Sequence, residues 1–471
     1  MSSAPDAIGS ETDIAARLDR LPSSGVLWKL VAVLSFGAFF EIYDIGLTAP
    51  LSLGLVKAGI FHLGAQGLFG LADQATFIAA TFCGLYLGTV IFSNFADRMG
   101  RRPVFTYSLV WYSVATVIMG LQSKAVNIDL WRLIASMGVG MELVAIDCYL
   151  AELTPKSIRG RAFTVSTAIQ YISAPVAALL ALLVIPRPLL GVVGWRWLCF
   201  VPAIGALMIW WVRRGLPESP RWLAARGRAT EADAITSQIE RRIEADGGAP
   251  LPPPEPVPPR PTAPAGRFAD LWAPGLRRRT LTMIVFHVFQ VIGYFGFSNW
   301  LPTLLLAKGV TITKTLSYGA AIAVAMPLSP LVFSAFADRF ERKWQIVAGA
   351  SLVAIFGLWF ASLDSRSPAL AFITLGVAIA SANNLMSYAY HTYQSEIFPT
   401  AVRARAVGFV YSFSRLSALF SGYLIAATLA RAGPGGVFVL ISGAMLIVSL
   451  TIALFGPATR GRSVEDISAV A

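Results

Sequence analysis

The chain has 471 residues, of which 56% are hydrophobic and only 14% are charged. Soluble globular proteins carry about 25% charged residues, so this surface cannot face water throughout and much of it must face lipid. The net charge of +12 does not indicate a nucleic-acid-binding protein, because the basic residues lie between apolar runs and form no single patch. Basic connections of this kind are what the positive-inside rule predicts.

About twelve apolar runs, each close to the roughly 20 residues that a spanning helix needs, follow the polar segment 1–26. The run that begins at Leu27 is too long for the hydrophobic region of a signal peptide, so no cleavable leader is predicted. We predict an all-α membrane protein with two six-helix bundles, 27–212 and 280–456. The predicted spans are 27–50, 74–95, 104–122, 130–150, 163–185, 194–212, 280–305, 316–336, 345–362, 369–391, 406–430 and 436–456.

The connections between these runs alternate in charge, and the basic set indicates which ends face the cytoplasm. By this rule both termini, 1–26 and 457–471, are cytoplasmic tails. The connection 213–279 is the only long one, and its stretch 249–266 is rich in proline. We therefore predict an extended, semi-rigid cytoplasmic linker between the two bundles. The basic connections contain Arg98, Arg101, Arg102, Lys156, Arg159, Arg161, Arg339, Arg342, Lys343, Arg403 and Arg405.

Two sequence motifs recur at matching places in the two halves. Asn94–Arg102, with an Asp-Arg pair at its centre, follows the second run, and Ala335–Lys343 follows the eighth. Ala151–Arg159 ends the fourth run with a Glu-x-x-Pro-x-x-x-Arg pattern, and Ser395–Arg403 ends the tenth. Chance rarely places two different motifs twice in this way, so the two halves are an internal repeat.

These motifs resemble those of the major facilitator superfamily. The segment Pro217–Leu223, together with Arg132 at the start of the fourth run, resembles the sugar porters. Phe39–Asp44 and Tyr294–Pro302 are closer to the metabolite:proton symporters, and within those to niacin and aromatic-acid transporters. The resemblance implies the major facilitator fold, in which two bundles expose a central site to each side of the membrane in turn. It also implies a multi-pass protein of the plasma (inner) membrane.

Charged residues at the cytoplasmic helix ends are predicted to pair across helices and to latch one conformation of the bundles. The alternative is that they are end-caps whose side chains reach water without a gating role. The loop motif departs from the family pattern, because Ser93 and Ser334 stand where a glycine is usual. The predicted gating residues are Asp97, Arg98, Arg102, Glu152, Arg159, Asp338, Arg339, Glu396 and Arg403.

Asp44 and Arg132 are charged residues inside predicted spans, where an unpaired charge is costly. Asp44 lies about 27 Å from the cytoplasmic end of its helix, and Arg132 lies near the outer start of an oppositely directed helix, so the two can pair. The resemblance to proton-coupled sugar porters implies a proton site, in which protonation of Asp44 releases Arg132. A permanent structural ion pair is the alternative. Glu41, one turn before Asp44 on the same face, is predicted to share the proton.

Glu142 and Asp147 are two further acids within the fourth span. Asp147 is 15 residues from Arg132, which places the two on similar helix faces but roughly 22 Å apart in depth. Glu142 lies on another face, near the middle of the bilayer. Either acid is predicted to relay protons toward the cytoplasm. The alternative for Asp147 is that arginines of the loops hold it in place.

Arg415 lies about 15 Å into the eleventh span, near the middle of the bilayer, and no acid lies in the same span. A guanidinium at this depth needs an anion, and its forked donors suit a carboxylate. In related organic-ion transporters the matching position is acidic in cation carriers and basic in anion carriers, so the resemblance implies an anionic substrate. The alternative is a permanent partner on another helix, such as Asp147 or Glu142.

Polar residues at similar depth complete the predicted site for a small aromatic or heteroaromatic acid. The resemblance places Gln170 and Tyr294 among cavity-lining positions, and Tyr388 replaces an acid found in the cation carriers. The alternative for each is an interhelical hydrogen bond. His287 and His391 receive no role. The predicted substrate-binding residues are Arg415, Gln170, Gln290, Tyr294, Asn383, Asn384 and Tyr388.

The sequence therefore predicts a secondary active transporter, and no enzyme: proton-coupled uptake of a small, nicotinate-like organic anion by a monomer in the lipid bilayer. No Gly-x-x-x-x-Gly-Lys-Ser/Thr motif for ATP hydrolysis is present. No cofactor or metal site is predicted, and Cys83, Cys148 and Cys199 are interpreted as buried apolar side chains. A sugar, polyol or organic-cation porter is the alternative in the same superfamily, although Arg415 weighs against a neutral sugar. A membrane sensor that keeps the fold without transport is the alternative of another class.

Overall fold

The computed structural model describes residues 13–62, 71–212, 216–247, 250–254, 267–334, 339–399 and 402–459. Those residues are helical, apart from turns, connections and one isolated β-bridge between Leu189 and Val192. The N-terminal half contains α2 (Gly25–Gly46), α3 (Thr48–Lys57), α4 (Asp73–Met99), α5 (Arg101–Gly120), α6 (Ala125–Leu153), α7 (Arg159–Tyr171), α8 (Ser173–Val184) and α9 (Gly194–Val212). The C-terminal half contains α12 (Pro274–Ala307), α13 (Ile312–Ala323), α14 (Ala325–Ser334), α15 (Arg342–Ser362), α16 (Ala369–Glu396) and α17 (Arg403–Phe455).

Three of the predicted spans are each built from two helices that meet at a single residue. The breaks lie at Leu47 between α2 and α3, at Ile172 between α7 and α8, and at Val324 between α13 and α14. α17 joins two helices across Gly433, whose φ of 67° is a left-handed conformation that glycine adopts without strain. Within the described residues, ten helices are long and apolar enough to cross a membrane. α17 is counted once among these ten, although it contains two of the predicted spans.

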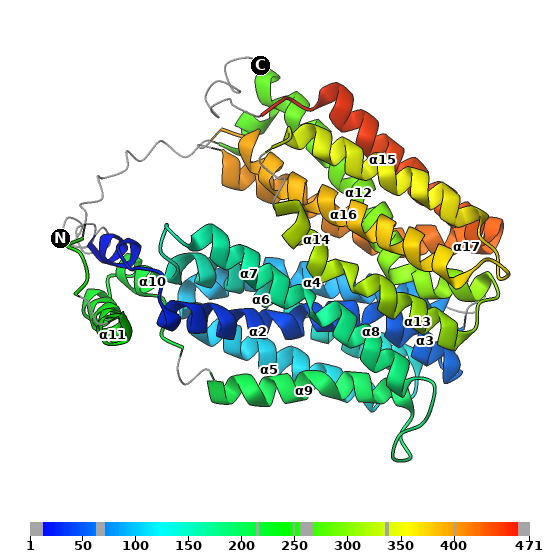
Figure 1. Ribbon diagram of the computed structural model, residues 1–471, viewed down its shortest axis with the longest axis horizontal. Coiled ribbons are helices and arrows are strands. Elements are labelled where there is room, and N and C mark those ends of the chain that lie inside the picture. The colour runs from blue at the N-terminus through cyan, green and yellow to red at the C-terminus, as the bar shows by residue number, and fades with distance from the viewer. Residues whose placement is uncertain are drawn as a thin grey trace.

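The two halves lie against each other at one end and diverge toward the end near α10 (Pro220–Ala225) and α11 (Ala229–Gly247) (Figure 1). At the closed end the side-chain amide of Gln74 donates a hydrogen bond to the carbonyl of Asn299 (2.8 Å), and the hydroxyl of Thr303 donates to the amide oxygen of Gln74. The rings of Phe82 and Phe295 pack edge to face with centroids 4.5 Å apart. These contacts join the halves at the end away from α10 and α11.

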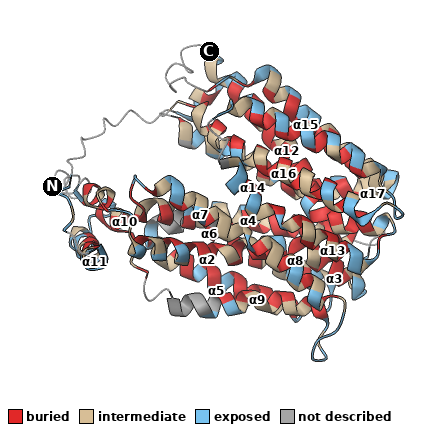
Figure 2. Cartoon of the chain, viewed as in Figure 1, coloured by how far each residue is buried: buried red, intermediate tan, exposed pale blue. Residues whose placement is uncertain are grey.

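Helices α4 and α6 touch backbone to backbone because glycines line their contact. Gly84 and Gly88 are four residues apart and therefore share one face of α4. A Cβ on Gly88 would lie 2.1 Å from the carbonyl oxygen of Met137, and a Cβ on Gly140 would lie 2.3 Å from that of Leu85. In contrast, large apolar side chains on outward faces are exposed (Figure 2), as on α5 at Val110, Trp111 and Val114. This pattern suits a bundle that is packed inside and surrounded by lipid.

A small helical cluster lies outside the bundles, next to the N-terminal half (Figure 1). It contains α10 (Pro220–Ala225), α11 (Ala229–Gly247) and the helical segment 13–19. Ile239 and Ile243 on α11 pack with Ile14 and Leu18. These helices lie in segments that hydropathy alone interprets as a tail and a linker, because α11 buries only a narrow apolar stripe. The proline-rich stretch falls largely outside the described residues.

Ion pairs fasten this cluster together. Arg17 contacts Glu240 at 2.7 Å, and Arg20 contacts the other carboxylate oxygen of Glu240 at 2.6 Å. Burial alone would raise the pKa of Glu240, but hydrogen bonds from the two arginines hold it below its ordinary value. The short helix η3 (Phe268–Trp272) then leads the chain into α12.

We expect Gly88→Ala to destabilise the protein by about 1–3 kcal/mol, because a methyl group at this contact forces α4 and α6 apart. The measurement is the Tm of the detergent-purified protein, followed by tryptophan fluorescence. Gly408→Ala is the matched control, since a Cβ there has nothing within 4 Å, and its Tm should stay level or rise. Equal losses of Tm in the two variants would contradict the close approach.

Candidate functional site

The repeated motifs form equivalent ion pairs, one in each half. Arg101 contacts Glu152 at 3.1 Å between α5 and α6, and Arg342 contacts Glu396 at 2.9 Å between α15 and α16. Each pair therefore joins neighbouring helices of its own half, at the end where the halves diverge. The side chain of Asp97 and the residue Asp338 lie outside the described residues.

The remaining predicted gating residues occupy the same end of the bundles. Arg98 and Arg339 are exposed. The main-chain N–H of Arg102 donates to the carboxylate of Glu218 (3.2 Å). Arg159 donates to the carbonyl of Thr154 (3.1 Å) and contacts Asp19 (3.5 Å), and Arg403 donates to the carbonyl of Phe398 (3.3 Å). Their gating role stays a prediction.

Asp44 and Arg132 form a fully buried ion pair of 2.8 Å between α2 and α6. Arg132 also donates to the hydroxyls of Thr48 (3.1 Å) and Thr81 (2.9 Å) and to the main-chain carbonyl of Asp44 (2.9 Å). The second carboxylate oxygen of Asp44 accepts a hydrogen bond from Thr116 (3.0 Å). The depth argument from sequence is confirmed for the pairing itself. Both charges are fully hydrogen-bonded, so the pair is stable away from water.

Glu41 and Glu142 form a second group of buried acids in the same half. Glu41 is 3% exposed and Glu142 is fully buried. Within the described residues, Glu41 Oε1, both carboxylate oxygens of Glu142 and the hydroxyl of Tyr112 have no hydrogen-bond partner. Ser108 is near Glu142, but its hydroxyl donates to the carbonyl of Phe105 (3.0 Å). An ionised carboxylate is costly without partners, so this group suits protonated acids.

Arg415 lies half-buried on α17. Its charge is close enough to Glu41 of α2 for an electrostatic interaction, and Glu41 is similarly close to Asp147 of α6. Within the described part of the chain, no carboxylate lies within ion-pair distance of Arg415. Its guanidinium carbon instead lies 5.4 Å from the ring centroid of Tyr411, over the aromatic face. The structure thus shows no permanent ion pair of Arg415 with Asp147 or Glu142, and Asp147 itself is exposed.

Aromatic residues that the sequence analysis did not select gather around Arg415. The rings of Tyr390 and His391 on α16 are stacked with centroids 4.1 Å apart. His391 is exposed and lies 6.3 Å from Tyr411, while His287 packs between Tyr390 (5.5 Å) and Tyr411 (5.4 Å). Tyr411 stands one helical turn before Arg415, and that spacing is the signal that could have identified it.

The other predicted substrate-binding residues divide into exposed and buried groups. Tyr388 is 37% exposed, and Gln170 and Tyr294 are half-buried. Tyr294 interacts electrostatically with Tyr171 and Tyr411, so it lies near the Arg415 group. The buried group contains Gln290, Asn383 and Asn384.

The described residues offer no group of three or more histidine, cysteine, aspartate or glutamate side chains that could hold a metal ion. Cys83, Cys148 and Cys199 form no disulfide; Cys199 is buried as predicted, whereas Cys83 and Cys148 are half-buried. The described residues supply the site with buried acids, the cations Arg132 and Arg415, and aromatic rings. Such a site can bind a small ion and exchange protons.

Comparisons with known proteins agree with this architecture. A match to the family described as "Sugar (and other) transporter" covers residues 30–471. The putative metabolite transport protein YyaJ of Bacillus subtilis is 30% identical, over 96% of this chain and 97% of that protein. The niacin transporter NiaP of Acinetobacter baylyi is 26% identical, over 97% of this chain and 99% of its own.

Among solved structures, the inward-open xylose transporter XylE of E. coli has the same fold, with a TM-score of 0.72. It is 19% identical and the match covers 94% of this chain and 99% of XylE. These relatives and neighbours are membrane transporters and not enzymes. The chain therefore belongs to the sugar (and other) transporter family of the major facilitator superfamily.

Proposed function

We propose that the chain is a proton-coupled symporter that takes up a small aromatic organic acid through the plasma membrane by alternating access. In this topology α9 and the two parts of α17 complete twelve crossings, and both termini are cytoplasmic. Because the halves diverge at the end near α10 and α11 (Figure 1), we infer that this conformation opens inward. The protein acts as a monomer.

The observation that carries the substrate class is the environment of Arg415. A guanidinium near the middle of the membrane is costly without an anion, and no carboxylate of the described residues is within ion-pair distance of it. A substrate carboxylate would supply that anion and could accept two parallel hydrogen bonds. The rings of Tyr411 and His391, which are not buried, lie where an aromatic substrate could stack, and Tyr390 packs behind His391.

The names of two relatives support an aromatic acid. Besides the niacin transporter, a Bacillus subtilis protein named putative niacin/nicotinamide transporter is 23% identical over 93% of this chain. Niacin is a pyridine ring with one carboxylate, which is the chemistry that Arg415 and its aromatic neighbours suit.

Proton coupling is assigned to the Asp44–Arg132 pair. Protonation of Asp44 would remove the charge that Arg132 holds at 2.8 Å, and the freed guanidinium would favour a different packing of α2 against α6. The opening of the bundles and the state of this pair can therefore be linked. Glu41 and Glu142 lie between this pair and the exposed Asp147 along the bundle, and we propose that they carry protons between them.

The family description and the xylose transporter favour a second candidate, a sugar or polyol porter. Uptake into proteoliposomes of labelled nicotinate, benzoate and glucose, with and without an inward proton gradient, decides between the two. We expect nicotinate or benzoate to accumulate with the gradient. Accumulation of glucose alone would refute the organic-acid proposal.

Arg415→Ala should weaken binding of the transported acid roughly 10- to 150-fold, since a charged hydrogen bond contributes about 1.5–3 kcal/mol. Arg415→Lys keeps the charge but loses the forked geometry, so its binding should be intermediate. Ligand-induced shifts of Tm measure both. Arg405→Ala, at the exposed start of α17, is the control and should bind normally. If the Arg415 variants bind like the wild type, the arginine has a structural role.

Asp44→Asn mimics the protonated acid and should abolish accumulation driven by a proton gradient, while exchange of labelled for unlabelled substrate continues. Both are measured in the same proteoliposomes. Glu142→Gln is the comparison: it should slow accumulation without abolishing it if Glu142 only relays protons. Should Asp44→Asn still accumulate substrate along the gradient, the coupling site lies elsewhere.

A further inference from the structure

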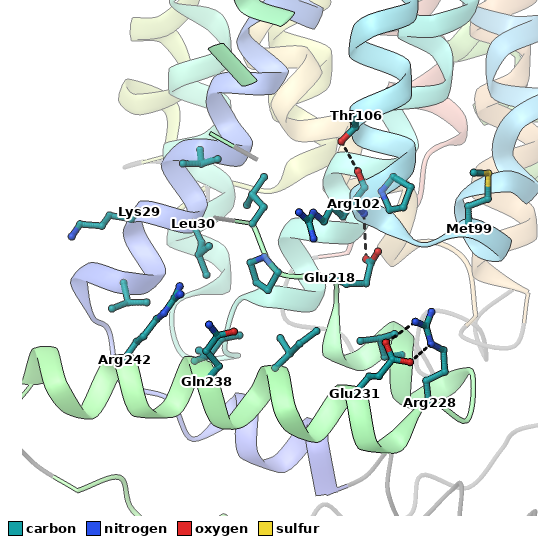
Figure 3. Close-up of a pocket in the computed structure, with 18 of the residues that line it drawn as sticks. Lys29, Leu30, Met99, Arg102, Thr106, Glu218, Arg228, Glu231, Gln238 and Arg242 are labelled. Carbon is teal, nitrogen blue, oxygen red and sulfur yellow. Dashed lines mark hydrogen bonds and ion pairs between the residues drawn. The ribbon is translucent and has the colours of Figure 1, made fainter. Parts of the chain in front are cut away.

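A cavity of about 1110 Å³ lies away from the central site, between the first turns of α2 and α5 and the side of α11 (Figure 3). α11 runs across the ends of the two membrane helices and covers the cavity from outside the bundle. The proposed transport cycle has no use for this space, because the cavity lies within the N-terminal half and not between the halves.

One part of the lining is apolar and adjoins the membrane. Leu30 and Val33 come from the first turns of α2, and Pro103 and Tyr107 come from those of α5. Tyr107 is 58% exposed, and it begins an exposed apolar side of α5. That side faces lipid, so an acyl chain can reach the cavity from the bilayer. It continues with Val110, Trp111 and Val114.

The other part of the lining is cationic. The guanidinium groups of Arg102, from α5, and Arg242, from α11, are directed into the space between the helices (Figure 3). Lys29 adds an ammonium group at the rim. In the described part of the chain, the side chains of these three residues make no ion pair. They therefore leave positive charge available at the level where the membrane ends.

Two of the acids in the cavity are already engaged. Glu218 accepts hydrogen bonds from the main-chain N–H groups of Arg101 (2.9 Å) and Arg102 (3.2 Å), at the first turn of α5. Glu231 accepts two hydrogen bonds from Arg228, at 2.7 and 2.6 Å. Those bonds raise the pKa of Arg228 and lower that of Glu231.

Asp246 is the remaining acid of the lining. Its Oδ2 lies 3.0 Å from the position that a Cβ on Gly25 would occupy, at the start of α2. A carboxylate is favourable there, because the N–H groups of the first helical turn carry partial positive charge. Asp246 alone does not offset all three cations.

We propose that this cavity binds an anionic phospholipid, with the phosphate between Arg102 and Arg242 and one acyl chain along Leu30, Val33 and Tyr107. Guanidinium groups hold phosphate oxygens through paired hydrogen bonds. Basic pockets between membrane helices at the cytoplasmic side are suited to anionic lipid headgroups. A soluble phosphate would use the cationic part alone and would leave the apolar part without a ligand.

Native mass spectrometry of the delipidated full-length protein tests the proposal with three probes: dioleoyl phosphatidylglycerol, dioleoyl phosphatidylcholine and sn-glycerol 3-phosphate. We expect phosphatidylglycerol to stay bound and the other two to bind at least tenfold more weakly. Arg242→Glu should lower phosphatidylglycerol binding about tenfold or more, since each basic residue near the surface contributes about 1 kcal/mol. Val33→Trp, which fills the apolar part, should lower it as well.

Arg241→Glu is the matched control, because Arg241 is the exposed neighbour on α11 and does not line the cavity. It changes the net charge equally and should bind lipid normally. Equal binding of the two lipids, or equal losses in the Arg241 and Arg242 variants, would overturn the proposal. Binding of glycerol 3-phosphate as strong as that of the lipid would instead indicate a soluble phosphate ligand. None of these measurements involves the transported substrate. The lipid proposal can therefore fail while the proposed transport function holds, and the reverse is also true.

Discussion

The buried pair of Asp44 and Arg132 is the interaction on which the interior of the N-terminal half depends. Neither charge has access to water, and removing one partner would leave the other unpaired in a medium that solvates ions poorly. The pair can persist only because Thr48, Thr81 and Thr116 complete its hydrogen bonds. Because Asp44 and Arg132 share this set of hydrogen bonds, one proton on the Asp44 carboxylate alters every contact that Arg132 makes.

The two halves repeat each other at their ends but not in their interiors. The ion pairs Arg101–Glu152 and Arg342–Glu396 occupy equivalent places. In the membrane, however, the acids belong to the N-terminal half, whereas Arg415 and its aromatic neighbours belong to the C-terminal half. Under the proposed function the duplication supplies the scaffold, and divergence between the halves separates the proton site from the substrate site.

Depth along a helix could be predicted from sequence, because each residue adds a fixed rise of about 1.5 Å. This is why the pairing of Asp44 with Arg132 was predictable from two antiparallel helices. Which way a side chain points depends on the packing of neighbours, which a single sequence does not contain. Asn383 and Asn384 have suitable depth yet lie buried inside their own half. Tyr411 and His391 reach the open surface without any charge to mark them.

The small cluster of α10, α11 and the segment 13–19 shows a second limit. α11 is polar overall and buries only a stripe that includes Ala232, Ile239 and Ile243, so a search for apolar runs passes over it. Its partner segment, 13–19, is far away in sequence, and nothing in either segment alone indicates the other. Ion pairs such as Arg17–Glu240 become visible only when the two are brought together.

The single-residue breaks have a consequence for movement. The segmented helices make part of the contact between the halves: α7 packs on α14, α8 on α13 and α3 on α12, while the unsegmented α4 packs on α17. In contrast, α5, α6, α15 and α16 have no such break. The close backbone contact at their glycines holds α4 and α6 together as one stiff unit. Bending is therefore easiest at Leu47, Ile172 and Val324. We expect each half to rock as a stiff frame while its contact helices flex at these three joints, so that one end of the molecule can close as the other opens.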